Sequence, residues 1–446
     1  MYNVSGTEQV QLEDTPERII LDVAEKMGIA NLKPKQLEAI SAFLSGRDVF
    51  VSLPTGYGKS IIFALLPAMF NRIRDCNDSL VVCISPLASL EMDLTEKFRS
   101  RGINAVFVGE QQKDWGQRRR VLDGNVEIVF TSPENIICNK MYRNMLRSEV
   151  YKKRLVALVV DEAHCVKTWG DEFRTEFSKI GELRSLIPTS VNIMALTATA
   201  TSEVLKVVTE RLSLDNPLII GLSPSQSHIF YNAEKLPDIA NYCRELSAKL
   251  KIKRLSFPKI LIFCRSYADC GTMYRILEVL MGPHFTEPYG SPAKFHCFRL
   301  VDMYTRASTS KMKQKVLNSF VTVNGKLQVV IATTAFSMGI DCPEIRTVVH
   351  FGTPGTVEEY VQESGRAGRD HNPATARMLY GKPPKGTSVQ MKSYGTNKRE
   401  CRRKLLFKNF LFSSENSDDI QLCKCCDNCA KTCKCSDCSS GDNIVQ

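Results

Sequence analysis

Long apolar runs are absent from the sequence, and this absence excludes two classes of protein. The longest strongly apolar stretch, residues 61–70, is far shorter than the roughly 20 residues needed to cross a bilayer. The N-terminal segment MYNVSGTEQVQLEDTPER has no apolar core of the kind that a secretion signal contains. We therefore expect neither a membrane-spanning segment nor secretion. The mean hydropathy of −0.16 is that of an ordinary globular chain.

Basic residues outnumber acidic ones unevenly along the chain. The 446 residues are enough for about three domains. They carry 59 Lys and Arg against 48 Asp and Glu, a net charge of +11. Residues 384–410 hold eight basic residues against Glu400: Lys385, Lys392, Lys398, Arg399, Arg402, Arg403, Lys404 and Lys408. Such a block attracts polyphosphate partners, although a solvated helix face has the same composition.

The 17 cysteines are also unevenly distributed, with nine before residue 400 and eight between Cys401 and Cys438. Cys83 and Cys264 lie in apolar runs, where a free thiol behaves as a small buried hydrophobe. Scattered thiols without a secretion signal indicate a reducing compartment. The C-terminal cluster is therefore interpreted as metal-binding in preference to disulfide-bonded.

Short apolar runs alternate with longer helix-like stretches, which predicts an α/β fold with parallel sheets covered on both faces. The pattern pauses near residues 215–235 and then resumes, which indicates two α/β domains. A third, smaller unit begins after the Gly- and Pro-rich residues 381–386 and contains a basic helix at about 390–411. The predicted strands are 48–53, 80–85, 126–131, 155–160, 191–196, 259–264, 327–332 and 347–351.

The stretch Leu53-Pro-Thr-Gly-Tyr-Gly-Lys-Ser60 follows a predicted strand and opens a helix predicted from Lys59 to about Ile73. Its two glycines allow backbone N–H groups to converge on phosphate oxygens. Lys59 would reach the β- and γ-phosphates, and the Ser60 hydroxyl would bind Mg²⁺. Leu53 stands where such loops usually begin with glycine, and a simple Gly-rich turn is the alternative.

Asp161-Glu-Ala-His164 comes directly after an apolar strand. Carboxylates at the carboxyl end of a buried parallel strand lie where open α/β sheets bind ligands. Asp161 suits Mg²⁺ coordination through water, and Glu162 suits polarising an attacking water. An acidic pair in this place is also a common helix N-cap, but the phosphate-loop motif upstream favours the catalytic interpretation.

Gln362-Glu-Ser-Gly-Arg-Ala-Gly-Arg369-Asp lies in the second α/β domain. If this segment is helical, Gln362, Arg366 and Arg369 share one face. Two arginines at a domain boundary can reach a γ-phosphate and stabilise the phosphoryl-transfer transition state. An exposed basic helix is the alternative, which the two glycines disfavour because they weaken a helix.

Cys423-x₂-Cys426-x₂-Cys429 has the spacing of a zinc-binding loop. We expect Cys401 on the basic helix to supply the fourth ligand of a closed, structural Zn²⁺ site, although free or redox-active thiols are the alternative. Four further cysteines would either hold a second ion or compete for the first: Cys425, Cys433, Cys435 and Cys438.

Taken in order, these motifs resemble those of superfamily-two helicases, and within them the RecQ family of DNA helicases. The resemblance covers roughly residues 16–430. It also rests on Leu196-Thr-Ala-Thr-Ala-Thr201, on residues 332–341 and on Cys165-Val-Lys-Thr-Trp-Gly-Asp-Glu-Phe-Arg174. The stretch Ser85-Pro-Leu-Ala-Ser-Leu-Glu-Met-Asp93 and the C-terminal cysteines favour RecQ over DEAH-box RNA helicases.

The resemblance implies a fold of two tandem RecA-like domains followed by a small helical zinc-binding subdomain. The expected boundaries are a tail at 1–15, RecA-like domains at 16–220 and 221–383, a zinc-binding subdomain at 384–438 and a tail at 439–446. No winged-helix domain is recognisable after the cysteines, so we expect translocation to be retained and processive unwinding to be weakened.

The resemblance also implies roles for single residues. Gln36 matches the glutamine that recognises adenine, and Thr197 and Thr199 match the motif that links hydrolysis to domain movement. The residues implied to bind ATP are Gln36, Thr55, Gly56, Gly58, Lys59 and Ser60. Trp169, Phe173 and Arg174 match a loop that senses single-stranded DNA, and an indole can stack on a base. A buried core turn is the alternative for that loop.

The function implied is an ATP- and Mg²⁺-dependent helicase or translocase that moves 3′ to 5′ on single-stranded and tailed duplex DNA, acts in repair or recombination, and resides in the nucleus. Two other functions use the same residues differently. One is an RNA helicase, because the core is shared. The other is a module without motor activity that binds or anneals nucleic acid through its basic, cysteine-rich end.

Overall fold

The computed structural model describes residues 16–435 apart from 87, 110–111, 169–174, 323–324, 337–341, 343 and 414–419. Contacts divide the chain into two compact units that meet in sequence at Ile220 and Gly221, and the short segments 52–57 and 197–205 group with the second unit. Among the described helices, none is both long enough and apolar enough to cross a membrane.

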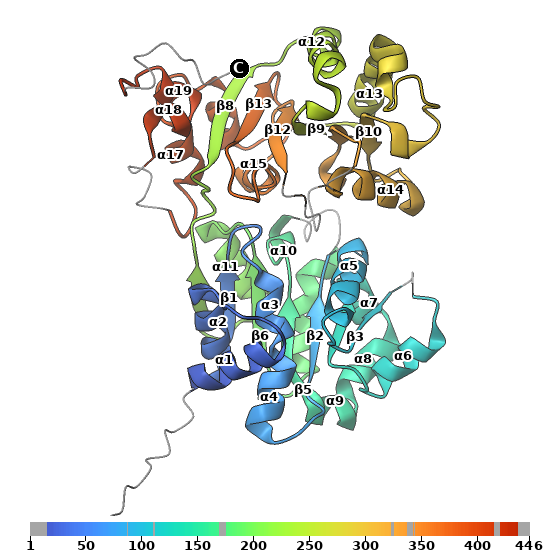
Figure 1. Cartoon of the computed structure of the whole chain (residues 1–446). Coiled ribbons are helices and arrows are strands. Elements are labelled where there is room, and N and C mark those ends of the chain that lie inside the picture. The colour runs from blue at the N-terminus through green and yellow to red at the C-terminus, as the bar shows by residue number, and fades with distance from the viewer. Residues whose placement is uncertain are drawn as a thin grey trace, which may run out of the picture. The chain divides into compact units, whose positions relative to one another are not determined.

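The first unit is built on a seven-stranded sheet in the order β3-β4-β2-β5-β6-β1-β7 (Figure 1). The pairs β3–β4, β4–β2, β2–β5 and β5–β6 are all parallel. Every residue of β2, β4 and β5 is buried, as expected for strands covered on both faces. The strands are β1 (Val49–Ser52), β2 (Leu80–Ile84), β3 (Ala105–Val108), β4 (Ile128–Thr131), β5 (Leu155–Val160), β6 (Asn192–Thr197) and β7 (Leu218–Gly221).

Short helices connect these strands. The helix predicted from Lys59 to Ile73 is two helices, because Pro67 has no N–H to continue the hydrogen-bond ladder. The helices are α1 (Pro16–Lys26), α2 (Pro34–Leu44), α3 (Lys59–Ala64), α4 (Leu66–Arg74), α5 (Ala88–Arg99), α6 (Trp115–Leu122), α7 (Pro133–Cys138), α8 (Lys140–Arg147), α9 (Glu149–Arg154), α10 (Cys165–Thr168), the 3₁₀ helix η1 (Thr175–Ser185) and α11 (Ser202–Arg211).

The second unit is built on a six-stranded sheet in the order β10-β11-β9-β12-β13-β8, and every neighbouring pair is parallel. The strands are β8 (Ile229–Lys235), β9 (Lys259–Cys264), β10 (Val301–Tyr304), β11 (Val329–Ala332), β12 (Ile345–Phe351) and β13 (Ala374–Tyr380). The two sheets confirm the α/β class, and the apolar runs at 155–160 and 259–264 are strands over the predicted residues. Cys83 and Cys264 are buried, as expected.

Two hydrophobic clusters cover the six-stranded sheet. One cluster includes residues of α12 (Ile239–Lys253) and α13 (Tyr267–Met281). The other joins residues of α15 (Val357–Ser364) to the C-terminal part of the chain. The remaining connections are α14 (Ser310–Val321) and the short 3₁₀ helices η2 (Arg254–Ser256), η3 (Gly282–Phe285), η4 (His296–Phe298) and η5 (Thr334–Phe336).

The C-terminal module, residues 389–413 and 420–435, packs against β8, the edge strand of this sheet (Figure 1). Phe407, Phe410, Cys425 and Cys426 belong to the same core cluster as the strands, so the module shares a core with the second unit. An isolated parallel β-bridge joins Tyr231 of β8 to Cys426, so one backbone pairing continues the sheet beyond its edge strand. The module's helices are α16 (Val389–Thr396), α17 (Arg402–Phe407), α18 (Leu422–Cys425) and α19 (Asp427–Ala430).

The basic helix predicted at about 390–411 is interrupted between α16 and α17. The Asn397 side chain accepts hydrogen bonds from the backbone N–H groups of Arg399 (3.1 Å) and Glu400 (3.0 Å). This local turn competes with helical hydrogen bonding and ends α16.

Candidate functional site

The phosphate-loop motif lies between β1 and α3, at the carboxyl end of its strand. Gly56 and Gly58 have φ angles of 83° and 91°, which favour glycine. At Gly58 a side chain is also excluded by contact, because a Cβ atom there would lie 2.7 Å from Nε2 of Gln36. Helix α3 then begins at Lys59 with Ser60 in its first turn, as the motif predicts.

Gln36 connects α2 to this loop. Its Nε2 donates a hydrogen bond to the Gly58 carbonyl (3.0 Å), and its Oε1 accepts one from the Lys33 N–H (2.8 Å). The side chain is buried. The residue expected to recognise adenine therefore also fixes the conformation of the phosphate loop.

The acidic motif follows β5, which lies between β2 and β6 in the sheet. The Asp161 N–H donates to the Ile84 carbonyl of β2 (2.9 Å), and the Ala163 N–H donates to the Leu196 carbonyl of β6 (2.8 Å). Glu162 has a φ of 49°, a left-handed conformation that costs free energy for a residue with a side chain. Strain of this kind is typical of functional sites, and here both neighbouring strands hold it in place.

Electrostatics connect the two motifs of the first unit. Burial raises the pKa of Asp161 from 3.8 to about 7, and the negative charge of Glu162 adds to the rise. The positive charge of Lys59 acts in the opposite direction on the Asp161 pKa, so the Lys59 ammonium lies near this carboxylate. His164 Nδ1 lies 3.4 Å from Glu162 Oε2. A buried aspartate followed by a half-buried glutamate, with the charge of a lysine acting on it, is an arrangement suited to a divalent cation and phosphate.

In the second unit, Gln362 lies on α15 and is buried. The helix ends at Ser364, and Arg366 and Arg369 follow in a series of turns, so the three residues do not share one helical face. Gly368 has a φ of 61°, a conformation that favours glycine and allows this path. Its N–H donates a hydrogen bond to the Ile345 carbonyl of β12 (2.8 Å). The turns are therefore tied to the sheet, and they carry both arginines.

Glu363 and His350 form a buried pair next to these arginines. No sequence motif indicates this pair, because the two residues are 13 positions apart. His350 Nε2 lies 3.0 Å from Glu363 Oε2. Burial raises the pKa of Glu363 well above its ordinary value, with a contribution from the charge of Glu359, and burial lowers the pKa of His350 to about 3. Both shifts favour the neutral form of the side chain, which suits their burial.

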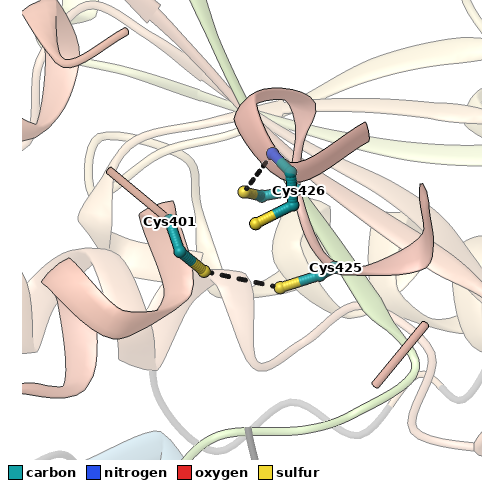
Figure 2. Close-up of side chains that lie close together, drawn as sticks. Cys401, Cys425 and Cys426 are labelled. Carbon is teal, nitrogen blue, oxygen red and sulfur yellow. Dashed lines mark hydrogen bonds between the residues drawn. The ribbon is translucent and has the colours of Figure 1, made fainter. Parts of the chain in front are cut away.

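Four cysteine sulfurs in the C-terminal module lie within 4.8 Å of one another: Cys401, Cys425, Cys426 and Cys429. Figure 2 shows the sulfurs of Cys401, Cys425 and Cys426 directed toward one another, with Cys401 and Cys425 3.6 Å apart. Three of the four residues are those predicted. Cys425 takes the place expected for Cys423, which lies with Cys433 and Cys435.

The thiols of this quartet perturb one another. Hydrogen bonds from the thiols of Cys425 and Cys426 lower the pKa of Cys401 well below its ordinary value. The Cys426 sulfur also accepts backbone N–H groups of Arg402 and Cys429, both at 3.4 Å. A hydrogen bond with Cys401 raises the pKa of Cys425, and burial raises the pKa of Cys429, so without a metal the quartet favours a thiolate at Cys401. Four cysteine sulfurs suit a structural Zn²⁺ ion, whose positive charge would stabilise the other thiolates.

Arg402 and Arg403 are internal residues of the module, unlike the other six basic residues of the predicted cluster, which are exposed. Arg402 pairs with Asp427 and donates to the carbonyls of Tyr394 (2.7 Å) and Ala233 (3.3 Å). Arg403 donates to the Ile229 carbonyl (2.5 Å) at the start of β8. The sequence alone gave no signal for this role, because buried and exposed arginines look alike in composition.

The structure bears differently on the remaining predicted residues. Thr197 and Thr199 are buried, and Thr197 Oγ1 accepts from the Thr199 N–H (3.2 Å). The proposed DNA-sensing residues Trp169, Phe173 and Arg174 lie outside the described residues, as do Gly339, Ile340 and Asp341 of the 332–341 motif.

Comparisons with known proteins agree with these motifs. Residues 33–207 match the family described as DEAD/DEAH box helicase, and residues 242–371 match the helicase conserved C-terminal domain. Among solved structures, the DEAD-box helicase Mss116 bound to ssRNA has a TM-score of 0.67 at 15% identity, covering 91% of this chain and 79% of that one. The Mycobacterium smegmatis helicase Lhr bound to ssDNA has a TM-score of 0.64 at 18% identity, covering 89% of this chain and 50% of that one. These identities establish the fold alone.

Curated relatives are more similar in sequence. The mouse ATP-dependent DNA helicase Q1 is 31% identical over 422 residues, which cover 90% of this chain and 60% of the mouse protein. The fission-yeast ATP-dependent DNA helicase hus2/rqh1 is 31% identical over 91% of this chain and 30% of its own length. The budding-yeast ATP-dependent helicase SGS1 is 30% identical over 93% of this chain and 28% of its own length. The chain thus spans less than two thirds of each of these relatives. With its two RecA-like sheets, its ordered helicase motifs and its C-terminal cysteines, this chain belongs to the RecQ family of helicases.

Proposed function

We propose that this chain is an ATP-dependent DNA helicase or translocase that couples ATP hydrolysis to 3′-to-5′ movement on single-stranded DNA. The observation that carries the proposal is in the first unit. There a glycine-rich loop presents Lys59 near the buried carboxylate of Asp161, and Glu162 follows at the end of the central strand β5. This is the arrangement that phosphoryl transfer requires.

Each predicted residue keeps its role in this proposal. Gln36 binds adenine, the loop from Thr55 to Ser60 binds the phosphates, and Ser60 and Asp161 hold Mg²⁺, which neutralises charge on the phosphates. Glu162 orients the attacking water. Gln362, Arg366 and Arg369 act on the γ-phosphate and stabilise the charge that develops during transfer.

The quartet of Cys401, Cys425, Cys426 and Cys429 is proposed to hold a structural Zn²⁺ ion. When bound, the ion cross-links the start of α17 to α18 and α19. Arg402 of α17 pairs with Asp427 of α19 and donates a hydrogen bond to the Ala233 carbonyl of β8, so it connects the same helices to β8. A DNA partner is proposed from the names of the relatives, which are ATP-dependent DNA helicases. A preference for single-stranded and tailed duplex DNA, a role in repair or recombination and residence in the nucleus are proposed from the resemblance to the RecQ family.

The test is ATP hydrolysis by the purified chain with and without single-stranded DNA. We expect DNA to stimulate turnover, and we expect Lys59→Ala and Glu162→Gln each to lower the stimulated rate by about 10³-fold or more. Lys97→Ala, at an exposed lysine of α5, is the matched control and should keep the wild-type rate. Near-normal turnover in either variant would remove the proposed mechanism.

The choice of nucleic acid is tested separately. Stronger stimulation by RNA than by DNA would overturn the DNA assignment in favour of an RNA helicase. Salt-sensitive DNA binding without any ATP hydrolysis would instead indicate a module that only binds or anneals nucleic acid. A 3′-tailed duplex should be unwound in preference to a 5′-tailed one, and the reverse preference would refute the polarity.

A further inference from the structure

A second group of thiols lies in the C-terminal module, apart from the quartet. The sulfurs of Cys423, Cys433 and Cys435 lie within 4.8 Å of one another, and those of Cys423 and Cys435 are 3.7 Å apart. All three residues are half-buried. The quartet is complete without them, so this trio is not a set of alternative ligands for the same ion.

The backbone explains why the cysteines separate into two groups. Cys423 and Cys425 both lie on α18, and residues two positions apart on a helix point about 200° away from each other. Cys425 therefore faces the quartet and Cys423 faces away from it. Cys426 is extended, with φ −164° and ψ 167°, and this break in the helix allows it to join Cys425 in the quartet.

The chain then turns back toward Cys423. After α19, the Thr432 N–H bonds the Cys429 carbonyl (3.1 Å), and the Cys433 N–H bonds the Ala430 carbonyl (3.3 Å). These two turns reverse the direction of the chain. They place Cys433 and Cys435 beside Cys423, on the other side of α18 from the quartet.

The sulfur spacing fits a metal ion. In a tetrahedral ion with metal–sulfur bonds of about 2.3 Å, neighbouring sulfurs are about 3.8 Å apart. The distance between Cys423 and Cys435 is 3.7 Å, and that between Cys401 and Cys425 in the quartet is 3.6 Å. A disulfide requires sulfurs about 2.05 Å apart and would use only two of the three thiols.

We propose that Cys423, Cys433 and Cys435 form a second metal site, which binds a thiophilic divalent cation such as Zn²⁺ through three thiolates. Three thiolates and a divalent ion leave one negative charge. Lys424 and Lys434, next to two of the ligands in the sequence, supply positive charge nearby. The ion would fix residues 431–435 to α18, so the module would contain two cross-links instead of one.

The proposal is tested by counting metal ions in the full chain, purified under reducing conditions, by mass spectrometry of the eluted metal. We expect two Zn²⁺ per wild-type chain and one in the variant Cys433→Ser/Cys435→Ser. The control Cys138→Ser/Cys297→Ser removes two exposed thiols that belong to neither group and should keep two ions. One ion in the wild type, or no loss in Cys433→Ser/Cys435→Ser, would overturn the second site.

The assignment of Cys423 has its own test. Adding Cys423→Ser to the double variant should leave one ion, because the quartet does not use this residue. Adding Cys401→Ser and Cys425→Ser instead should leave none, because only two thiols of the quartet then remain. Loss of the last ion on removing Cys423 would refute the division between the two groups.

Misfolding is controlled with the metal-loaded wild-type chain, produced with Co²⁺ in place of Zn²⁺, by measuring the thiolate-to-cobalt charge-transfer absorption and the cobalt content per chain. Two cobalt ions bound through thiolates support the proposal, and one overturns it. Neither measurement depends on ATP hydrolysis, so the second site and the proposed helicase activity can fail independently.

Discussion

Replacing Arg402 by alanine should loosen the C-terminal module from the second unit. This guanidinium is only 2% exposed, pairs with Asp427 and donates to two carbonyls, those of Tyr394 and Ala233. Asp427 is half-buried, with its side chain 17% exposed. Removing one member of a buried ion pair costs about 3–5 kcal/mol, because the other charge loses its partner while it stays largely out of water. For a folding unit of 150–250 residues this corresponds to a fall in Tm of about 6 to 20 °C.

The assay is thermal unfolding of the full chain followed by calorimetry, which resolves separate transitions if the two units unfold independently. Lys404→Ala is the matched control, because it removes an exposed basic residue from the same helix. The double variant Arg402→Met/Asp427→Leu should recover part of the loss, since neither charge then remains buried alone. If Arg402→Ala unfolds at the same temperature as Lys404→Ala, the buried pair does not hold the module and the reasoning is wrong.

Three other predictions concern the residues around the site. Glu363→Gln should stabilise the protein at pH 8, because burial raises the pKa of the folded wild-type carboxyl well above its ordinary value of 4.5, so that proton release above this pH favours the unfolded state. The gain should vanish as the pH falls toward 4, and a pH-independent difference in Tm would contradict it. Gln36→Ala should raise the KM for ATP about 10- to 100-fold, because it removes the hydrogen bonds to the Lys33 N–H and the Gly58 carbonyl that hold the phosphate loop. An unchanged KM would refute a role of Gln36 in ATP binding. Gly368→Ala should lower the Tm more than Gly386→Ala. Both glycines have positive φ, but only at Gly368 would a Cβ atom meet neighbouring atoms, at 2.7 Å from the Asn372 carbonyl oxygen. Equal effects on the Tm would mean that the structure relaxes around this contact at no cost.

Much of the fold was predictable because buried parallel strands are apolar throughout. The run at 155–160 has six apolar residues, and the run at 259–264 has five apolar residues after Lys259; each became a strand over those residues. Helix boundaries were less predictable. They depended on single residues that interrupt helical hydrogen bonding: Pro67 in the helix after the phosphate loop, and the Asn397 side chain between α16 and α17.

The site was predictable where residues close together in the sequence determine the local backbone conformation, as at Gly58, Lys59 and the acidic pair after β5. It was not predictable where the geometry depends on distant parts of the chain. His350 meets Glu363 only because β12 and α15 pack together. The choice of Cys425 over Cys423 in the quartet depends on where α18 ends, and no spacing rule contains that information.

The position of the C-terminal module over β8 has a consequence for solubility. A parallel sheet exposes unpaired N–H and C=O groups along its last strand, and such a strand can recruit another chain. Here the Cys426 bridge to Tyr231 and the Arg403 bond to the Ile229 carbonyl occupy part of that border. If the proposed Zn²⁺ holds the module together, a chelator that removes the ion would uncover these unpaired groups, and we expect self-association of the protein to follow.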